Sequence, residues 1–151
     1  MGRTDTASRV IRAPADKIYA AHLDPRAVVA WRPPQGMRAE IEMFDAREGG
    51  GYRMAFIYED ASVRGKTSAN ADVFEGQFVE LVPEQRIVER VVFESDDAAF
   101  AGAMTVMTTL TPVPGGTEVG IVCENVPVGI RAEDHAMGMA STLANLAAFL
   151  E

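Results

Sequence analysis

Apolar side chains recur at helical spacing near the end of the chain. Met139, Leu143, Leu146 and Leu150 follow one another at steps of four, three and four residues, which places them on one side of an α-helix. This spacing predicts a long amphipathic helix from Glu133 to Glu151. Because most of the preceding chain has the pattern of short strands, we expect a sheet that wraps around this helix, with a cavity between the two.

Short stretches of alternating apolar and polar residues fill the middle of the chain and predict β-strands. The expected strands cover Ala39–Ala46, Tyr52–Glu59, Ala71–Val82, Arg86–Glu94, Ala103–Thr111 and Thr117–Glu124. Glycine and proline predict tight turns at 49–51, 83–84 and 114–116, and a loop is expected over Asp60–Ser68. The short turns favour hairpins and therefore antiparallel pairing of neighbouring strands.

The beginning of the chain predicts a strand followed by two short helices. The strand is expected over Ser8–Arg12 and the first helix over Ala15–Leu23. Asp24 followed by Pro25 predicts the start of a second helix, with Asp24 as its N-cap, and Pro33–Pro34 end that helix. Since neither an internal repeat nor a low-complexity linker interrupts the chain, residues 1–151 are expected to form one domain.

The order of a strand, two helices, about six further strands and a long final helix resembles the helix-grip fold of the START-like (SRPBCC) superfamily, which includes the Bet v 1 allergens and polyketide cyclases. The stretches that carry the resemblance are IRAPADKIYAAHLDP, GGGYR, GQFVELVPEQRIVERVVF and EDHAMGMASTLANLAAFLE. They look most like bacterial single-domain proteins related to the activator of Hsp90 ATPase (the AHSA1 family). The resemblance implies an α+β fold in which a curved antiparallel sheet of six or seven strands grips the last helix over a mostly apolar cavity.

One face of the expected strand over Tyr52–Glu59 is aromatic and apolar. Alternation groups Tyr52, Met54, Phe56 and Tyr58, and we expect this face to point inward, as a cavity wall or as ordinary core. The eight methionines and the single tryptophan allow the same two interpretations, cavity wall or ordinary core, because such side chains fill cores as well as pockets. The side chains expected to contact a ligand are Trp31, Tyr52, Met54, Phe56, Tyr58, Phe74, Glu89, Val91, Phe93, Met104, His135, Met139 and Leu143.

Glu89 interrupts the apolar face of the expected strand over Arg86–Glu94. Ile87, Val91 and Phe93 share its face, and in the family that the chain resembles this face is typically bulky and lies against the helix. Pointing inward, Glu89 needs a partner or must take up a proton. It is then the best candidate to fix a polar ligand group or to act as an acid or base. The alternative is that a twist or bulge turns Glu89 toward solvent.

The two histidines and the single cysteine indicate no metal site and no disulfide. Neither His22 nor His135 has a second histidine or cysteine at metal-ligand spacing. We expect His22 at the surface near the end of its helix, and His135 at the cavity entrance or in solvent. Cys123 is expected to pack as a small buried hydrophobe.

Charge and motifs exclude further classes of protein. The net charge of −8 argues against nucleic acid or an anionic membrane as a partner, and no stretch has the roughly 20 apolar residues of a membrane span. The glycine clusters lack nucleotide-binding spacing and no G-x-S-x-G occurs, so no cofactor is expected. A lone cysteine and the lack of a signal peptide favour the cytoplasm.

Three functions are compatible with these patterns. The first is binding of a small apolar or amphipathic molecule in the cavity. The second is a cofactor-independent enzyme, such as a polyketide cyclase, dehydratase or hydrolase, which needs converging polar groups; Glu89, Tyr52, Tyr58 and His135 are the candidates. The third is regulation of an Hsp90-type chaperone. The chain is expected to be a monomer or a homodimer, because exposed edge strands can pair between copies.

Overall fold

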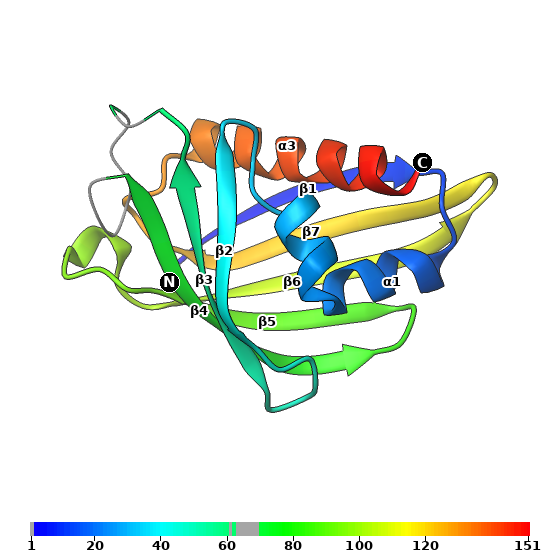
Figure 1. The fold of residues 1–151 in the computed structure, drawn as a ribbon, viewed down its shortest axis with the longest axis horizontal. Coiled ribbons are helices and arrows are strands. Elements are labelled where there is room, and N and C mark those ends of the chain that lie inside the picture. Colours follow the sequence, from blue (N-terminus) through cyan, green and yellow to red (C-terminus); the bar gives the residue numbers. More distant parts are fainter. Residues whose placement is uncertain (1, 61, 63–69) are drawn as a thin grey trace.

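The computed structural model describes residues 2–60, 62 and 70–151, so most of the predicted loop over Asp60–Ser68 lies outside the described residues. Within them, seven strands form one antiparallel sheet in the order β1-β7-β6-β5-β4-β3-β2. Figure 1 shows the elements, which in chain order are β1 (Arg3–Ile11), α1 (Ala15–Leu23), α2 (Pro25–Trp31), β2 (Met37–Phe44), β3 (Gly51–Tyr58), β4 (Ala71–Val82), β5 (Arg86–Phe93), the 3-10 turn η1 (Ala98–Phe100), β6 (Ala103–Val113), β7 (Gly116–Val126) and α3 (Ala132–Leu150).

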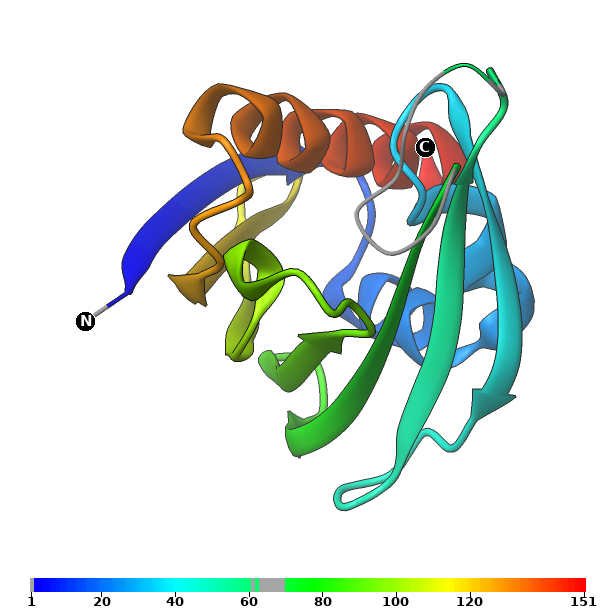
Figure 2. The same ribbon diagram turned by 90° about the vertical axis from the view of Figure 1, so that its left-hand side faces the viewer.

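The sheet is strongly curved, and α3 lies along its concave side next to β1 (Figure 2). The helices α1 and α2 connect β1 at one edge of the sheet to β2 at the other edge. The prediction of an α+β helix-grip fold with a long final helix is therefore confirmed. No helix in the described part of the chain combines the length and the apolarity that crossing a membrane requires.

Local sequence signals explain where the short helices begin. Asp24 Oδ1 accepts a hydrogen bond from the backbone N–H of Arg26 at 3.0 Å, and Pro25 occupies the first turn of α2. This is the predicted N-cap arrangement. The largest shift from prediction is in β1, which begins at Arg3 and not at Ser8.

Two groups of buried side chains form the core. The first lies between the centre of the sheet and the beginning of α3, and it includes Tyr52, Met54, Phe74, Phe78 and Met139. The second joins α1, α2 and the later part of α3, and it includes Ile18, Trp31, Val119, Leu143 and Leu146. The apolar stripe of α3 is thus divided: Met139 faces the first group, while Leu143 and Leu146 anchor the second.

Candidate functional site

A cavity of about 990 Å³ lies under the first half of α3. Strands β3 to β7 supply one wall, and α3 with the segment that precedes it supplies the other. Most of the wall is aromatic or apolar, with Phe56, Phe74, Phe93, Phe100, Met104 and Met139 among the lining residues. A space of this size and composition falls in the range of pockets for small organic molecules.

The cavity brings together many of the side chains that the sequence predicted as ligand contacts. Those that line it are Phe56, Tyr58, Phe74, Val91, Phe93, Met104, His135 and Met139. The predicted inward face of β3 accounts for the first two, because alternation places every second residue of a strand on one side. Cys123 also lines the cavity, although we expected it only as a small core residue.

Five predicted contacts do not line the cavity, so for them the structure differs from the prediction. Tyr52, Met54 and Glu89 are each at most 2% exposed and lie in the layer beneath the cavity wall. Leu143 packs in the second core group, one turn of α3 beyond Met139. Trp31 belongs to the same group, where its indole Nε1 donates to the backbone oxygen of Ala21 at 3.0 Å.

Glu89 points inward and has two partners. Its Oε1 accepts a hydrogen bond from the Tyr52 hydroxyl at 2.5 Å and another from Arg32 Nη2 at 2.9 Å. Arg32 Nη2 also donates to the Tyr52 hydroxyl oxygen at 3.1 Å. Arg32, Tyr52 and Glu89 therefore form a buried polar cluster, which we call the Arg–Tyr–Glu cluster. Of its three members, Arg32 lines the cavity.

The sheet register explains how Tyr52 reaches Glu89 across an intervening strand. Tyr52 on β3 is opposite Gly76 on β4, and Gly76 is opposite Val91 on β5. Because Gly76 has no side chain, the tyrosine ring lies across β4; a methyl group at Gly76 would overlap with Cζ and the hydroxyl of Tyr52. Neighbouring strands are about 4.8 Å apart, so this path lets the hydroxyl extend toward β5.

We expect Gly76→Ala to destabilise the protein by about 1–3 kcal/mol, the usual cost of overpacking a core. The Tyr52 ring is fully buried against the rings of Phe74 and Phe78 and cannot move aside without leaving Glu89. Urea unfolding followed by circular dichroism measures the change. The control is Gly138→Ala on α3, where the nearest atom to an added methyl is 4.0 Å away, so stability is expected to hold or rise. Equal effects of the two variants would contradict this role of Gly76.

Burial and charge together fix the protonation of Arg32 and Tyr52. Burial opposes the charge of Arg32 more strongly than any single neighbour favours it, yet the contacts with Glu89 and Tyr52 together outweigh burial and keep the pKa of Arg32 above its ordinary value. Burial raises the pKa of Tyr52 far above its ordinary value, and the charge of Arg32 only partly opposes this. Burial likewise raises the pKa of the Cys123 thiol to about 12, with help from Asp5 and Glu89. The tyrosine and the cysteine are therefore neutral at pH 7.

A second set of hydrogen-bonded polar side chains lies next to the cavity, at the start of α3. His135 Nδ1 lies 2.7 Å from Asp5 Oδ2, and both carboxylate oxygens of Asp5 accept hydrogen bonds of 2.9 Å from Arg3. Arg3 also donates to the backbone oxygen of Ile130. The hydrogen bonds from Arg3 hold the pKa of Asp5 below its ordinary value. An ionised carboxylate thus orients the one histidine that lines the cavity.

His22 lies inside the protein, which corrects the prediction that it occupies the surface. The residue is 4% exposed, its Nδ1 lies 2.8 Å from the backbone oxygen of Ile18, and its ring meets Trp31 edge to face. Burial lowers the pKa of His22 to about 4, and the Ile18 carbonyl opposes this only in part. His22 is consequently neutral at pH 7.

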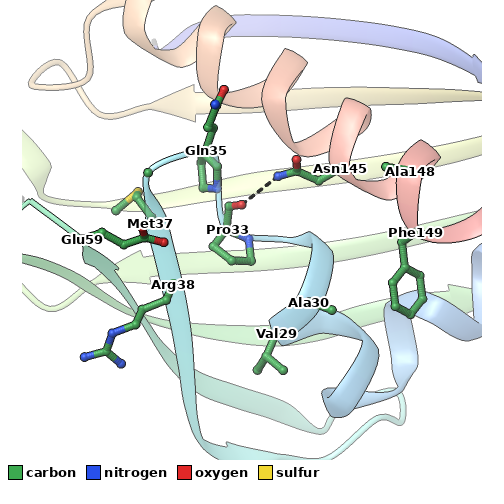
Figure 3. Close-up of a pocket in the computed structure, with 12 residues that line it drawn as sticks. Val29, Ala30, Pro33, Gln35, Met37, Arg38, Glu59, Asn145, Ala148 and Phe149 are labelled. Atoms are coloured by element: carbon green, nitrogen blue, oxygen red, sulfur yellow. Dashed lines mark hydrogen bonds between the residues drawn. The ribbon is translucent and has the colours of Figure 1, made fainter.

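A second hollow of about 490 Å³ lies outside the sheet, between α2, the start of β2 and the end of α3 (Figure 3). Asn145 Nδ2 donates to the backbone oxygen of Pro33 at 2.9 Å on its floor. Figure 3 shows Arg38 pointing outward, away from Asn145 and Phe149. Because this hollow has no buried ionisable side chain among its lining residues, the cavity under α3 is the stronger candidate for a functional site.

Metal binding finds no support in the described residues, since they contain no group of three or more His, Cys, Asp or Glu side chains that could hold an ion. Among the polar partners of Glu89 and His135, Arg32 and Asp5 were not predicted from the sequence. A signal for Arg32 existed: an inward Glu89 needs a partner, and Arg32 directly follows Trp31, which was itself expected to contact a ligand. No comparable pattern marked Asp5.

Comparison with known proteins shows the family of the chain. A model of the Activator of Hsp90 ATPase homolog 1-like proteins matches residues 12–151. No curated protein matches the chain.

Solved structures with the same fold come from several bacteria. Protein CV1439 from Chromobacterium violaceum has 36% sequence identity and a TM-score of 0.87, over 98% of this chain and 96% of that one. A protein from Rhizobium loti has 28% identity and a TM-score of 0.74, over 99% and 98% of the two chains. A protein from Rhodobacter sphaeroides, at 20% identity and a TM-score of 0.76 over 97% and 92%, shares the fold.

Proposed function

The chain belongs to the family of Activator of Hsp90 ATPase homolog 1-like proteins, and we propose that it binds a small apolar or amphipathic molecule in the cavity under α3. The observation that carries the proposal is that the cavity wall combines mostly apolar side chains with the charged side chain of Arg32. Aromatic and methionine side chains make up most of the wall, while Arg32 brings a charged guanidinium to it. Pockets for small molecules commonly combine such an apolar wall with a few polar groups that fix orientation.

The proposal is also supported by the fixed arrangement of the aromatic side chains in the cavity wall. The rings of Phe56, Phe74 and Phe93 contact one another edge to face, with centroids 4.9 Å and 6.0 Å apart along the series. These residues lie on three neighbouring strands of the sheet. A wall fixed by a sheet needs little rearrangement on binding, which lowers the entropic cost of binding a ligand.

Filling the cavity is the direct test. Val106 on β6 lines it and is only partly buried, so Val106→Trp should place an indole in the space. We expect the affinity for the neutral dye N-phenyl-1-naphthylamine, whose fluorescence rises in apolar surroundings, to fall at least about tenfold. Val79→Trp is the control, because Val79 is 52% exposed on β4 and does not line the cavity. Failure of the dye to bind the unmodified protein, or equal binding by both variants, would reject the proposal.

The contact between His135 and Asp5 favours a second candidate function, a cofactor-independent enzyme. A histidine oriented by a carboxylate is a common general base, and His135 lines the same cavity as Arg32. Turnover of a bound compound that is lost in His135→Gln while the compound still binds would favour the enzyme. Binding without turnover would favour the ligand-binding protein.

A further inference from the structure

Arg32 has hydrogen-bond donors for which no described residue is the acceptor. Its backbone is fixed on both sides: its N–H donates to the oxygen of Val28 at 2.9 Å, and its own oxygen accepts from Thr142 Oγ1 at 2.9 Å. In the side chain, the hydrogen bonds to Tyr52 and Glu89 both come from Nη2. A guanidinium has five N–H donors in total, so those on Nε and Nη1 are left over.

These remaining donors are reached from the cavity. In the described part of the chain, no fully buried side-chain nitrogen or oxygen lacks a hydrogen-bond partner. The Arg32 side chain is 14% exposed and lines the cavity. Its unused N–H groups therefore face the cavity, where water or a ligand can accept from them. The bound group has to be an acceptor, since arginine has no acceptor atom to offer.

The charge of Arg32 is already compensated, and this restricts the kind of acceptor. Glu89, 2% exposed, lies 2.9 Å from Nη2, and the Tyr52 hydroxyl is neutral. The described lining residues include two acidic side chains, Asp72 and Asp134, and two basic ones, Arg32 and Arg131. The described lining therefore has no excess of positive charge. A carboxylate ligand would add an uncompensated buried charge, which is costly. A neutral acceptor satisfies the donors without that cost.

We infer that Arg32 binds a neutral carbonyl oxygen of an aromatic ligand and discriminates against a carboxylate of the same shape. The inference rests on the proposed function and names its ligand class. The aromatic part follows from the wall, where Phe56, Phe74 and Phe93 line the cavity and their rings pack edge to face along the series. Rings pack favourably on such surfaces in edge-to-face and offset geometries.

Three probes of nearly identical shape test whether Arg32 prefers a neutral carbonyl oxygen over a hydrocarbon group and over a carboxylate. They are 2-acetylnaphthalene, which has a carbonyl oxygen; 2-isopropenylnaphthalene, which has a CH₂ group in its place; and 2-naphthoate, which is a carboxylate. Each displaces N-phenyl-1-naphthylamine from the unmodified protein at pH 7 according to its affinity. We expect 2-acetylnaphthalene to bind at least about tenfold more tightly than 2-isopropenylnaphthalene or 2-naphthoate. This difference corresponds to one hydrogen bond from a charged donor.

The variant that tests Arg32 removes both charges together. In Arg32→Met/Glu89→Gln we expect the ketone and the hydrocarbon to bind equally, while Arg38→Met, a change outside the cavity, keeps the preference. A second readout uses only the unmodified protein: the C=O stretching frequency of bound 2-acetylnaphthalene should lie below its value in an apolar solvent. This frequency reports the hydrogen bond even if the double variant does not fold.

The outcomes distinguish this inference from the proposed function. If 2-naphthoate binds most tightly, or if the hydrocarbon matches the ketone, the role of Arg32 is rejected and the binding function stands. An unshifted carbonyl frequency rejects it as well. If neither the dye nor any probe binds, the proposed function fails and the inference fails with it.

Discussion

Arg32→Met is expected to lower the free energy of unfolding at pH 7 by about 3–5 kcal/mol, the range for removing one partner of a buried ion pair. The substitution leaves the Glu89 carboxylate, 2% exposed, with the Tyr52 hydroxyl as its remaining hydrogen-bond partner in the Arg–Tyr–Glu cluster. Methionine matches the length of the arginine stem, so lost packing contributes little. Urea unfolding followed by tryptophan fluorescence and circular dichroism measures the change.

The double variant Arg32→Met/Glu89→Gln is the matched comparison for this effect. Glutamine has nearly the shape of glutamate and still accepts the Tyr52 hydroxyl, but it carries no charge. We expect the double variant to recover most of the stability that Arg32→Met loses, because the loss arises from the unpaired buried charge of Glu89. A double variant no more stable than the single one would mean that Arg32 stabilises the fold through packing.

Acidification should destabilise the protein through His22, beginning well above the range in which carboxylates titrate. The folded protein holds His22 neutral with a pKa of about 4, whereas the unfolded chain has the ordinary value of 6.5. Above pH 6.5 both states are neutral and the full stability is present. As the pH falls from 6.5 toward 4, the unfolded state binds a proton that the folded state does not, so stability is lost. The loss amounts to about 2 kcal/mol at pH 5 and approaches about 3 kcal/mol at pH 4.

His22→Phe isolates this contribution, because phenylalanine keeps an aromatic ring beside Trp31 and does not titrate. The measurement is the free energy of unfolding at pH 7, 6 and 5 for both proteins. We expect the unmodified protein to lose more stability than the variant over this interval. The lowered pKa values of Asp5 and Glu94 act below this interval in both proteins. Parallel pH curves would show that His22 is protonated in the fold or solvated.

The pattern of the chain was sufficient to predict the order of the helices and strands and the inward face of β3. Alternation on β3 and β5 grouped Tyr52 with Phe56 and Glu89 with Val91, and each pair lies on the concave side. The side-chain period of a strand is two, so register follows once one face is apolar. For Glu89 the sequence left two possibilities open, an inward position or a twist or bulge that turns it toward solvent, and the structure has the first.

Polar residues that pair across the fold escaped prediction, because their partners are distant in the sequence. Asp5 occupies an inward position that an apolar residue normally fills, so the first half of β1 showed no alternation. His135, its partner, is 130 residues away. His22 is buried because α1 and α2 enclose it with Trp31, which the local pattern of one short helix does not reveal. Tertiary contacts of this kind override local signals.

The position of β1 at the edge of the sheet has a consequence for synthesis of the chain. Among the described strands, β1 pairs only with β7, and Arg3 donates to the oxygen of Ile130, 127 residues later. A ribosome therefore releases the first strand long before its partners exist, and such distant pairing slows folding. Until α3 emerges, the aromatic concave face has no cover, which is the situation in which nascent chains aggregate. The surface that we propose holds a ligand therefore stays uncovered until the last helix has been translated.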